Sequence, residues 1–193
     1  MRSPLLFIIS GPSGAGKTTL LKKLFRRKFI RDNCLLSISY TTRPERPGEK
    51  EGRDYFFITE DIFAHFIRKK FFLETQRVGD DFYGTSVSFL HRAAKEAKDL
   101  ILCIDVKGEK YLKNNFKKGR IISIFVGVPD ERELFRRLKK RREKSFIIGK
   151  RIALAKKELK YLKYYTYLII NQDLDESIKN LEAIIRAERI KRV

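Results

Sequence analysis

Residues 11–18 read Gly11-Pro12-Ser13-Gly14-Ala15-Gly16-Lys17-Thr18, and they follow a short apolar run at residues 5–9. This is the pattern G-x-x-x-x-G-K-[ST], placed between a buried strand and the start of a helix. Its glycines let successive backbone N–H groups point into one concavity, which binds phosphate oxygens. Lys17 can then reach the β- and γ-phosphates, and the hydroxyl of Thr18 can bind Mg²⁺. The alternative is a glycine-rich turn that matches by chance, but the flanking strand and helix favour a nucleoside triphosphate site.

The composition is that of one globular domain: 193 residues, of which 42% are hydrophobic, are enough to bury a core. No apolar run approaches the ~20 residues of a membrane span, and residues 5–9 are too short for a signal peptide. We therefore expect a cytoplasmic protein that does not enter a membrane. Cys34 and Cys103 lie in apolar stretches without metal-ligand spacing and are expected to be reduced core residues.

The net charge is unusual, since 44 Lys and Arg against 24 Asp and Glu give +20. Such a field attracts polyanions, which favours a nucleic-acid binder. Against this, the charges are spread along the chain and no RNA-binding signature is present. Nucleic acid is therefore not expected as the main substrate, and an RNA-associated role stays as an alternative.

Apolar strand-like runs alternate with amphipathic helical stretches, which predicts an α/β protein with a mainly parallel sheet. In the main part of the chain we expect strands at 35–40, 100–105, 120–128 and 167–170. We expect helices at 17–28 and 86–98, another that follows the basic segment 130–151 and ends at about residue 163, and a terminal helix after residue 173. The Pro- and Gly-rich residues 41–54 predict an exposed loop that is functional or disordered. Residues 55–85 predict a small, partly antiparallel insert with strands at 55–58 and 71–78. Between them, Thr59 caps a helix that begins with Glu60 and Asp61.

Asp105 follows the apolar run 101–104, so it lies at the carboxyl edge of a parallel sheet, where the phosphate loop also opens. It is a candidate for holding the Mg²⁺ shell or a substrate hydroxyl. The alternative is that its side chain caps a following helix.

Several motifs, in the same order along the chain, resemble guanylate kinases. They are the phosphate loop with Ser10, residues 39–48, Gly52-Arg53-Asp54-Tyr55, Glu74, Tyr83-Gly84-Thr85, Ile104-Asp105 with Gly108, and residues 170–175. The resemblance covers nearly the whole chain and implies a P-loop NTPase-type three-layer fold with a single domain. Within it we expect a core (about 1–40, 86–130 and 152–193), a GMP-binding insert (about 41–85) and a helical lid (about 131–151).

The resemblance implies transfer of the γ-phosphoryl group of ATP to GMP, and to dGMP, with Mg²⁺ as cofactor. The implied ATP-binding residues are Gly11, Pro12, Ser13, Gly14, Ala15, Gly16, Lys17, Thr18, Thr19 and Asn171, with Thr18 on the metal. The implied GMP-binding residues are Ser39, Arg43, Arg46, Tyr55, Glu74, Tyr83, Thr85 and Asp105. The implied catalytic residues are Lys17, Arg43, Asp105, Arg137, Arg141 and Arg151.

The chemistry of these residues is consistent with the resemblance. Arg43 and Arg46 supply forked donors for a monophosphate dianion, although a single loop arginine is usually solvated. Glu74 lies in an apolar strand, where a carboxylate is costly unless it is paired. Guanine offers N1–H and N2–H side by side to two carboxylate oxygens and adenine does not, so Glu74 would select guanine. The alternative places Glu74 on the solvent face of an edge strand, paired with a lysine.

Two features depart from the family pattern. Cys103 stands where family members commonly carry an acid, which removes one charge near the metal or the substrate. The lid tip, residues 142–149, lacks the Thr/Ser- and acid-rich character usual in the family and is one residue short. We expect activity with altered lid closure or lid contacts between subunits, and the oligomeric state stays open.

Two rival functions share the scaffold: a binding module for partner peptides, and a kinase acting on ribose bisphosphate. The intact Lys17 and Thr18 argue against the first, and the set Ser39, Glu74 and Thr85 argues against the second.

Overall fold

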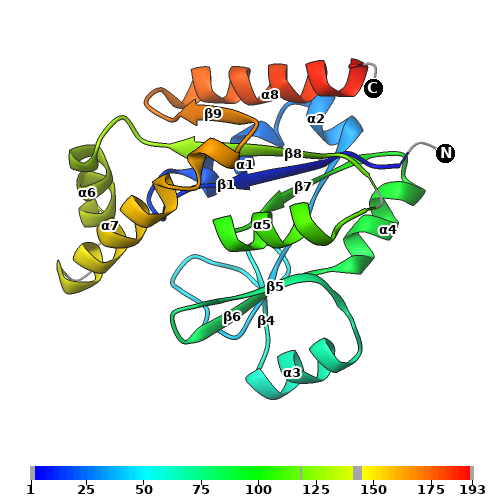
Figure 1. The fold of residues 1–193 in the computed structure, drawn as a ribbon, viewed down its shortest axis with the longest axis horizontal. Helices are drawn as coiled ribbons and strands as arrows, with labels where there is room; N and C mark the ends of the chain where they lie inside the picture. The colour runs from blue at the N-terminus through cyan, green and yellow to red at the C-terminus, as the bar shows by residue number, and fades with distance from the viewer. Residues whose placement is uncertain (1–2, 118, 141–144, 192–193) are drawn as a thin grey trace. The chain divides into compact units, whose positions relative to one another are not determined.

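The computed structural model describes residues 3–117, 119–140 and 145–191. A five-stranded sheet has the strand order β2-β7-β1-β8-β9, and a four-stranded sheet has the order β4-β3-β6-β5 (Figure 1). The chain divides into two compact units, one of Met1–Leu6 with Asn33–Arg120 and one of Phe7–Asp32 with Ile121–Val193. The α/β class and the mainly parallel sheet are confirmed.

The first unit holds the four-stranded sheet and two strands of the five-stranded sheet. Its elements are β2 (Cys34–Leu36), β3 (Tyr40–Thr41), β4 (Phe56–Phe57), α3 (Glu60–Arg68), β5 (Phe72–Val78), β6 (Asp81–Ser86), α4 (Val87–Lys95), β7 (Asp99–Cys103) and α5 (Val106–Asn115). Strands β2 and β7 pair in parallel, whereas β6 pairs antiparallel with both β3 and β5. The partly antiparallel strand pairing expected within residues 55–85 is therefore confirmed. So is the cap of α3, where Thr59 Oγ1 accepts a hydrogen bond from Ile62 N–H at 3.3 Å.

The second unit holds the phosphate loop. Apart from one end residue each of β1 and α2, it contains β1 (Leu6–Ser10), α1 (Lys17–Leu24), α2 (Lys28–Asn33), β8 (Ile121–Gly127), α6 (Glu131–Lys140), α7 (Ser145–Leu159), a 3₁₀ turn (Leu162–Tyr164), β9 (Tyr167–Ile170) and α8 (Leu174–Ile190). Strands β8 and β9 pair in parallel, α8 packs on α1 and β9, and α6 packs on α7. Residues Leu6 to Ile9 of β1 are fully buried, as expected for a central strand.

Several predicted element bounds are wrong; the helix expected at 86–98 ends at Lys95 and the strand expected at 100–105 ends at Cys103. The helix expected at 17–28 ends at Leu24, and a second helix, α2, begins at Lys28, because α1 ends in a tightened turn in which Arg26 and Arg27 N–H bond the carbonyls of Lys23 and Leu24. The expected helix to about 163 ends at Leu159.

The expected strand 35–40 is also two strands in two sheets. Ser37 N–H still bonds Ile101 O beside β7, whereas Ser39 O accepts from Phe56 N–H beside β4. The chain thus leaves the five-stranded sheet and enters the four-stranded sheet within residues 37–39. The boundaries given above to core, insert and lid stay predictions.

Candidate active site

The phosphate loop in the second unit has the backbone that its glycines allow. Gly11, Gly14 and Gly16 have φ values of 137°, 97° and 90°, in the region that side-chain-bearing residues rarely adopt. A Cβ on Gly11 would lie 2.1 Å from the carbonyl oxygen of Val126 in β8, so the loop leaves β1 in close contact with that strand. Only glycine fits this approach.

Helix α1 begins at the end of this loop with its amide groups uncapped by a side chain. Its N-cap is Gly16, and its first turn carries no acidic residue. The first N–H groups of a helix attract anions, and here no carboxylate of that turn competes for them. Lys17 Nζ donates to the carbonyls of Gly11 and Pro12, the latter at 3.0 Å, so the ammonium group lies over the loop. Thr18 and Thr19 are exposed at the start of the helix.

Distant segments of the second unit meet at this loop. The buried Asn171, which follows β9, donates from Nδ2 to Ala15 O at 2.7 Å. Arg137 of α6 donates to Ala15 O at 3.3 Å and to Asn171 O at 2.6 Å, while its Nε donates to Glu133 at 2.6 Å. Arg151 of α7 donates to the hydroxyl of Ser13. The structure therefore brings Arg137, Arg151 and Asn171 to the phosphate loop; Arg141 and Arg142 lie outside the described residues.

Arg136, next to Arg137 in α6, does not bond the phosphate loop. Arg136 is exposed and bonds Glu133 at 2.7 Å, as expected for a solvated helix face. The hydrogen bonds from Arg136 and Arg137 lower the pKa of Glu133 to about 2. Glu133 therefore stays ionised and holds Arg137 in its contact with the loop.

Glu74 is the central residue of the first unit's site. It lies on β5 opposite Thr85, whose Oγ1 donates to Glu74 Oε1 at 2.8 Å, and only 4% of its surface is exposed. Although β5 is an edge strand, α5 packs against it, and a Cβ on Gly108 of α5 would lie 2.9 Å from Glu74 Oε2. The alternative of a solvent-facing, lysine-paired Glu74 is therefore wrong.

Burial shapes the chemistry of this carboxylate. Loss of solvation raises the pKa of Glu74 from 4.5 to about 7, with a further increase from the nearby Asp105, although hydrogen bonds from the side chain and the backbone of Thr85 act in the opposite direction. A buried carboxylate with one hydroxyl donor has oxygen lone pairs available for further N–H donors. Ser39 lies one residue before Tyr40, which faces Gly84, so the register carries Ser39 toward Thr85.

Asp105 is the N-cap of α5, and its Oδ1 accepts from Gly108 N–H at 2.8 Å. The helix-cap alternative from the sequence is therefore present in the structure. The predicted role of Asp105 toward substrate or metal stays a prediction.

The second cluster of the first unit is cationic and aromatic. Arg43 is 7% exposed, and its guanidinium carbon lies 5.3 Å from the centre of the Tyr55 ring, which in turn packs edge-on against Tyr83. The pKa of Arg43 is raised even though burial lowers it, because Glu49 and Tyr83 interact with the guanidinium. For Tyr55, by contrast, burial is the main cause that raises the pKa of the hydroxyl to about 12, so the hydroxyl stays protonated and can donate. Arg46 is exposed.

Sequence reasoning missed Glu49, whose carboxylate binds both Arg43 and the backbone of Arg46. The available signal was an acidic residue three positions after Arg46 in a loop too rich in Pro and Gly for regular structure.

Comparison with known proteins places this geometry in a family. The family model described as guanylate kinase matches residues 3–188. The chain belongs to the guanylate kinase family. It is 40% identical over 187 residues to a guanylate kinase of Thermotoga maritima, covering 96% of this chain and 88% of that protein. It is also 40% identical over 193 residues to one of Coxiella burnetii, covering 100% of this chain and 91% of that protein.

A solved structure supports the same membership. The crystal structure of guanylate kinase from Anaplasma phagocytophilum matches with a TM-score of 0.79 at 28% identity, covering 98% of this chain and 87% of that one. The family resemblance stated from the sequence is therefore confirmed. Among the described residues of this family member, no helix is both long enough and apolar enough to cross a membrane.

Proposed function

We propose that this chain transfers the γ-phosphoryl group of ATP to GMP, and to dGMP, giving ADP and GDP or dGDP. Membership of the guanylate kinase family supports the reaction. The observation that carries the choice of base is Glu74, a carboxylate buried beside Thr85 and an N-capping Asp105. Guanine N1–H and N2–H supply the two adjacent donors that such a carboxylate lacks.

Adenine does not match this site. It presents an acceptor at N1, so one oxygen of the buried carboxylate would face the ring nitrogen lone pair without a donor and be repelled by it. Sites built to hydrogen-bond a particular group reject analogues that lack it by about 10⁴–10⁵-fold. We therefore expect GMP and dGMP to be accepted and AMP to be rejected, with Ser39 and Thr85 assisting at the base.

The remaining proposed roles follow from charge. Arg43, Arg46, Tyr55 and Tyr83 bind the monophosphate of GMP. The phosphate loop, including Lys17 and Thr19, binds the phosphates of ATP, while Asn171 and Arg137 organise the loop. Arg137, Arg141 and Arg151 stabilise charge on the transferring group. Catalysis is positioning and charge neutralisation, with no covalent intermediate.

The residues present fit a magnesium ion carried by ATP. Thr18 offers an exposed hydroxyl in the first turn of α1, next to Lys17, and the described residues contain no cluster of acidic, His or Cys side chains that could hold a metal by themselves. Mg²⁺ is usually bound through a few protein oxygens together with substrate phosphates and water. Thr18 would hold it. Bound there, the ion would neutralise phosphate charge.

We place this activity in purine nucleotide metabolism and GMP recycling, and therefore in the cytoplasm, where ATP and GMP are used. The test is ADP release from Mg·ATP with GMP, dGMP, AMP, UMP and ribose 1,5-bisphosphate as separate acceptors. Turnover with GMP and dGMP alone is expected. Turnover with the sugar bisphosphate, or none with any acceptor despite ATP binding, would refute the proposal.

A further inference from the structure

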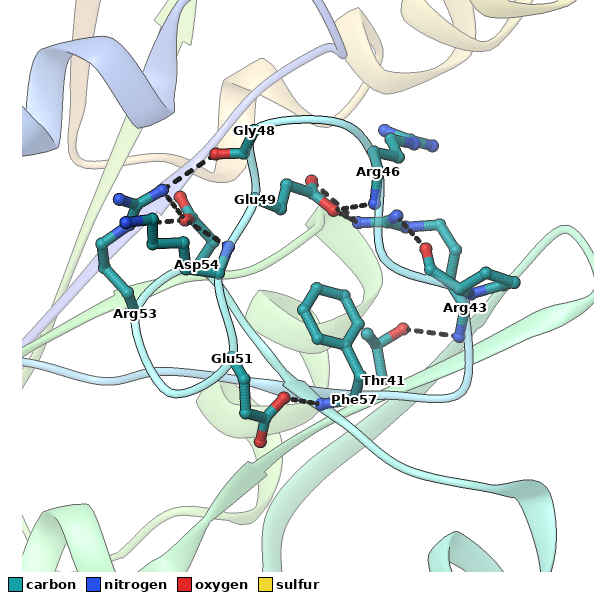
Figure 2. A network of polar contacts seen from close by, with 11 residues as sticks. Thr41, Arg43, Arg46, Gly48, Glu49, Glu51, Arg53, Asp54 and Phe57 are labelled. Carbon is teal, nitrogen blue, oxygen red and sulfur yellow. Dashed lines mark hydrogen bonds and ion pairs between the residues drawn. The ribbon is translucent and has the colours of Figure 1, made fainter.

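The loop between β3 and β4 is organised around the carboxylate of Glu49 (Figure 2). Both of its oxygens accept from Arg43 Nη2, at 3.0 and 2.9 Å, and Oε2 also accepts from Arg46 N–H at 3.0 Å. The side chain of Arg46 points away from this carboxylate in Figure 2. One carboxylate therefore fixes the side chain of one arginine and the backbone of the other.

Arg43 is held on its other sides as well. Nη1 donates to Pro44 O at 2.6 Å, and the guanidinium lies 5.3 Å from the ring of Tyr55 and 5.8 Å from that of Phe57. With 7% of the residue exposed, the guanidinium plane has little freedom to turn. Glu49 supplies the compensating negative charge that a buried guanidinium needs.

This guanidinium retains capacity for another acceptor. It carries five N–H donors; Nη1 donates to Pro44 O, Nη2 donates to the carboxylate of Glu49, and Tyr83 also interacts with the guanidinium. Nε is buried and has no hydrogen-bond partner among the residues that the structure describes. A buried donor without an acceptor is rare in folded proteins and is unfavourable until a ligand or water supplies one.

We propose that Glu49 is a positioning residue for the monophosphate of GMP: it sets the plane of Arg43 and the place of Arg46 before the substrate arrives. This rests on the proposed function, in which those two arginines bind the phosphate. An arginine that is already ordered loses less rotamer freedom on binding than a free one. Glu49 itself does not touch the substrate, so its effect passes through Arg43.

The opposite role makes the opposite prediction. If Glu49 occupied the place of the phosphate, its removal would relieve competition and repulsion, and GMP would bind more tightly. The arrangement of donors favours positioning, because Glu49 takes only Nη2 and the backbone of Arg46 and leaves Nε of Arg43 without an acceptor.

The test compares Glu49→Gln with Glu51→Gln. Glu51 is a matched control from the same loop: it is exposed and its Oε2 accepts from Phe57 N–H at 2.9 Å. Each variant removes one negative charge and keeps the side-chain shape. For Glu49→Gln we expect the KM for GMP to rise at least about tenfold, with kcat and the KM for ATP within about threefold of wild type. For Glu51→Gln we expect all three within about twofold.

A second readout separates positioning from simple loss of loop structure. Guanosine lacks the phosphate, so its inhibition constant should be the same in Glu49→Gln and wild type. Glu49→Asp keeps the charge with a side chain one methylene shorter, and should recover part of the affinity for GMP. Thermal unfolding shows whether Glu49→Gln is folded. If it is not, Glu49→Asp replaces it in the comparison of KM values.

Three results would overturn the inference: an unchanged or lower KM for GMP in Glu49→Gln, an equal effect of Glu51→Gln, or an equal weakening of guanosine. Failure of the proposed function is seen separately, as absence of GMP turnover in wild type. In that case calorimetric Kd values for GMP in the same variants still test Glu49.

Discussion

Replacing Glu74 with glutamine should weaken the reaction and strengthen the fold at the same time. The two side chains have nearly the same shape, and the glutamine oxygen can still accept from Thr85 Oγ1, which lies 2.8 Å from Glu74 Oε1. The substitution therefore changes the charge and one acceptor and leaves the packing of β5 against α5 in place. Each effect has its own magnitude.

The stability effect follows from the pKa of Glu74, which rises from 4.5 to about 7 on folding. Between these values the folded protein holds a proton that the unfolded chain has released, so stability falls as pH rises through this window. A shift of this size corresponds to about 3 kcal/mol above pH 7. Glu74→Gln lacks this loss, so its advantage over wild type should grow from near zero at pH 4.5 to about 3 kcal/mol above pH 7.

The catalytic effect has the opposite sign. Glutamine keeps one acceptor for guanine but turns an N–H₂ group toward the second guanine donor. The substitution therefore removes one charge-assisted hydrogen bond and places two donors opposite each other. This should cost about 3–4 kcal/mol in transition-state binding, or ~10²–10³-fold in kcat/KM for GMP. The same amide matches adenine, since it can donate to N1 and accept from N6–H, so AMP turnover should rise.

Urea unfolding at several pH values and kinetics with GMP and AMP measure the two effects on one preparation. Thr59→Ala, far from Glu74 in sequence, is a suitable control: it removes the cap of α3, costs about 1 kcal/mol and should leave base selection unchanged. The reasoning fails if Glu74→Gln keeps kcat/KM for GMP within about threefold of wild type, or if its stability relative to wild type does not depend on pH.

Three further outcomes are expected. In wild type, kcat/KM for GMP should fall about tenfold per pH unit below pH 7, because Glu74 becomes protonated. The pH profile of Glu74→Gln should lack this fall and show only the ionisation of GMP itself. Gly16→Ala should raise the KM for ATP more than about tenfold, because φ is 90° and the new Cβ would lie 2.5 Å from Asn171 Nδ2; an unchanged KM would contradict that placement. Arg137→Lys should lower stability by about 1–3 kcal/mol, since one ammonium nitrogen cannot replace the three separate guanidinium nitrogens that bond Glu133, Ala15 O and Asn171 O, and equal melting of variant and wild type would show these bonds to be dispensable.

Local chemistry made part of this molecule predictable. The glycines of the phosphate loop, the cap at Thr59 and strand β9 all follow from residues that are near one another in sequence. The buried Glu74 also carried its own signal, because an acid inside an apolar strand requires a reason.

The rest depends on contacts between residues far apart in the chain. Nothing near residue 137 indicates that Arg137 bonds the carbonyl of Ala15, 122 positions earlier. The division of the strand at residues 37–39 likewise depends on partners at Ile101 and Phe56 that periodicity does not include. Glu49 was missed because an acid in a charged loop looks solvated until its arginine is known to be buried.

The unfavourable burial of Glu74 is also the basis of its selectivity. In the free protein a carboxylate 4% exposed receives one hydroxyl hydrogen bond, and its raised pKa records the remaining cost. Because guanine supplies two donors, binding GMP removes that cost, and the pKa of Glu74 should fall when GMP binds. A nucleobase without those donors leaves the cost in place and adds its own desolvation. The discrimination between bases therefore depends on a carboxylate whose hydrogen-bonding capacity is not fully used in the free protein. A more solvated carboxylate at this position would give a more stable protein that distinguishes bases less well.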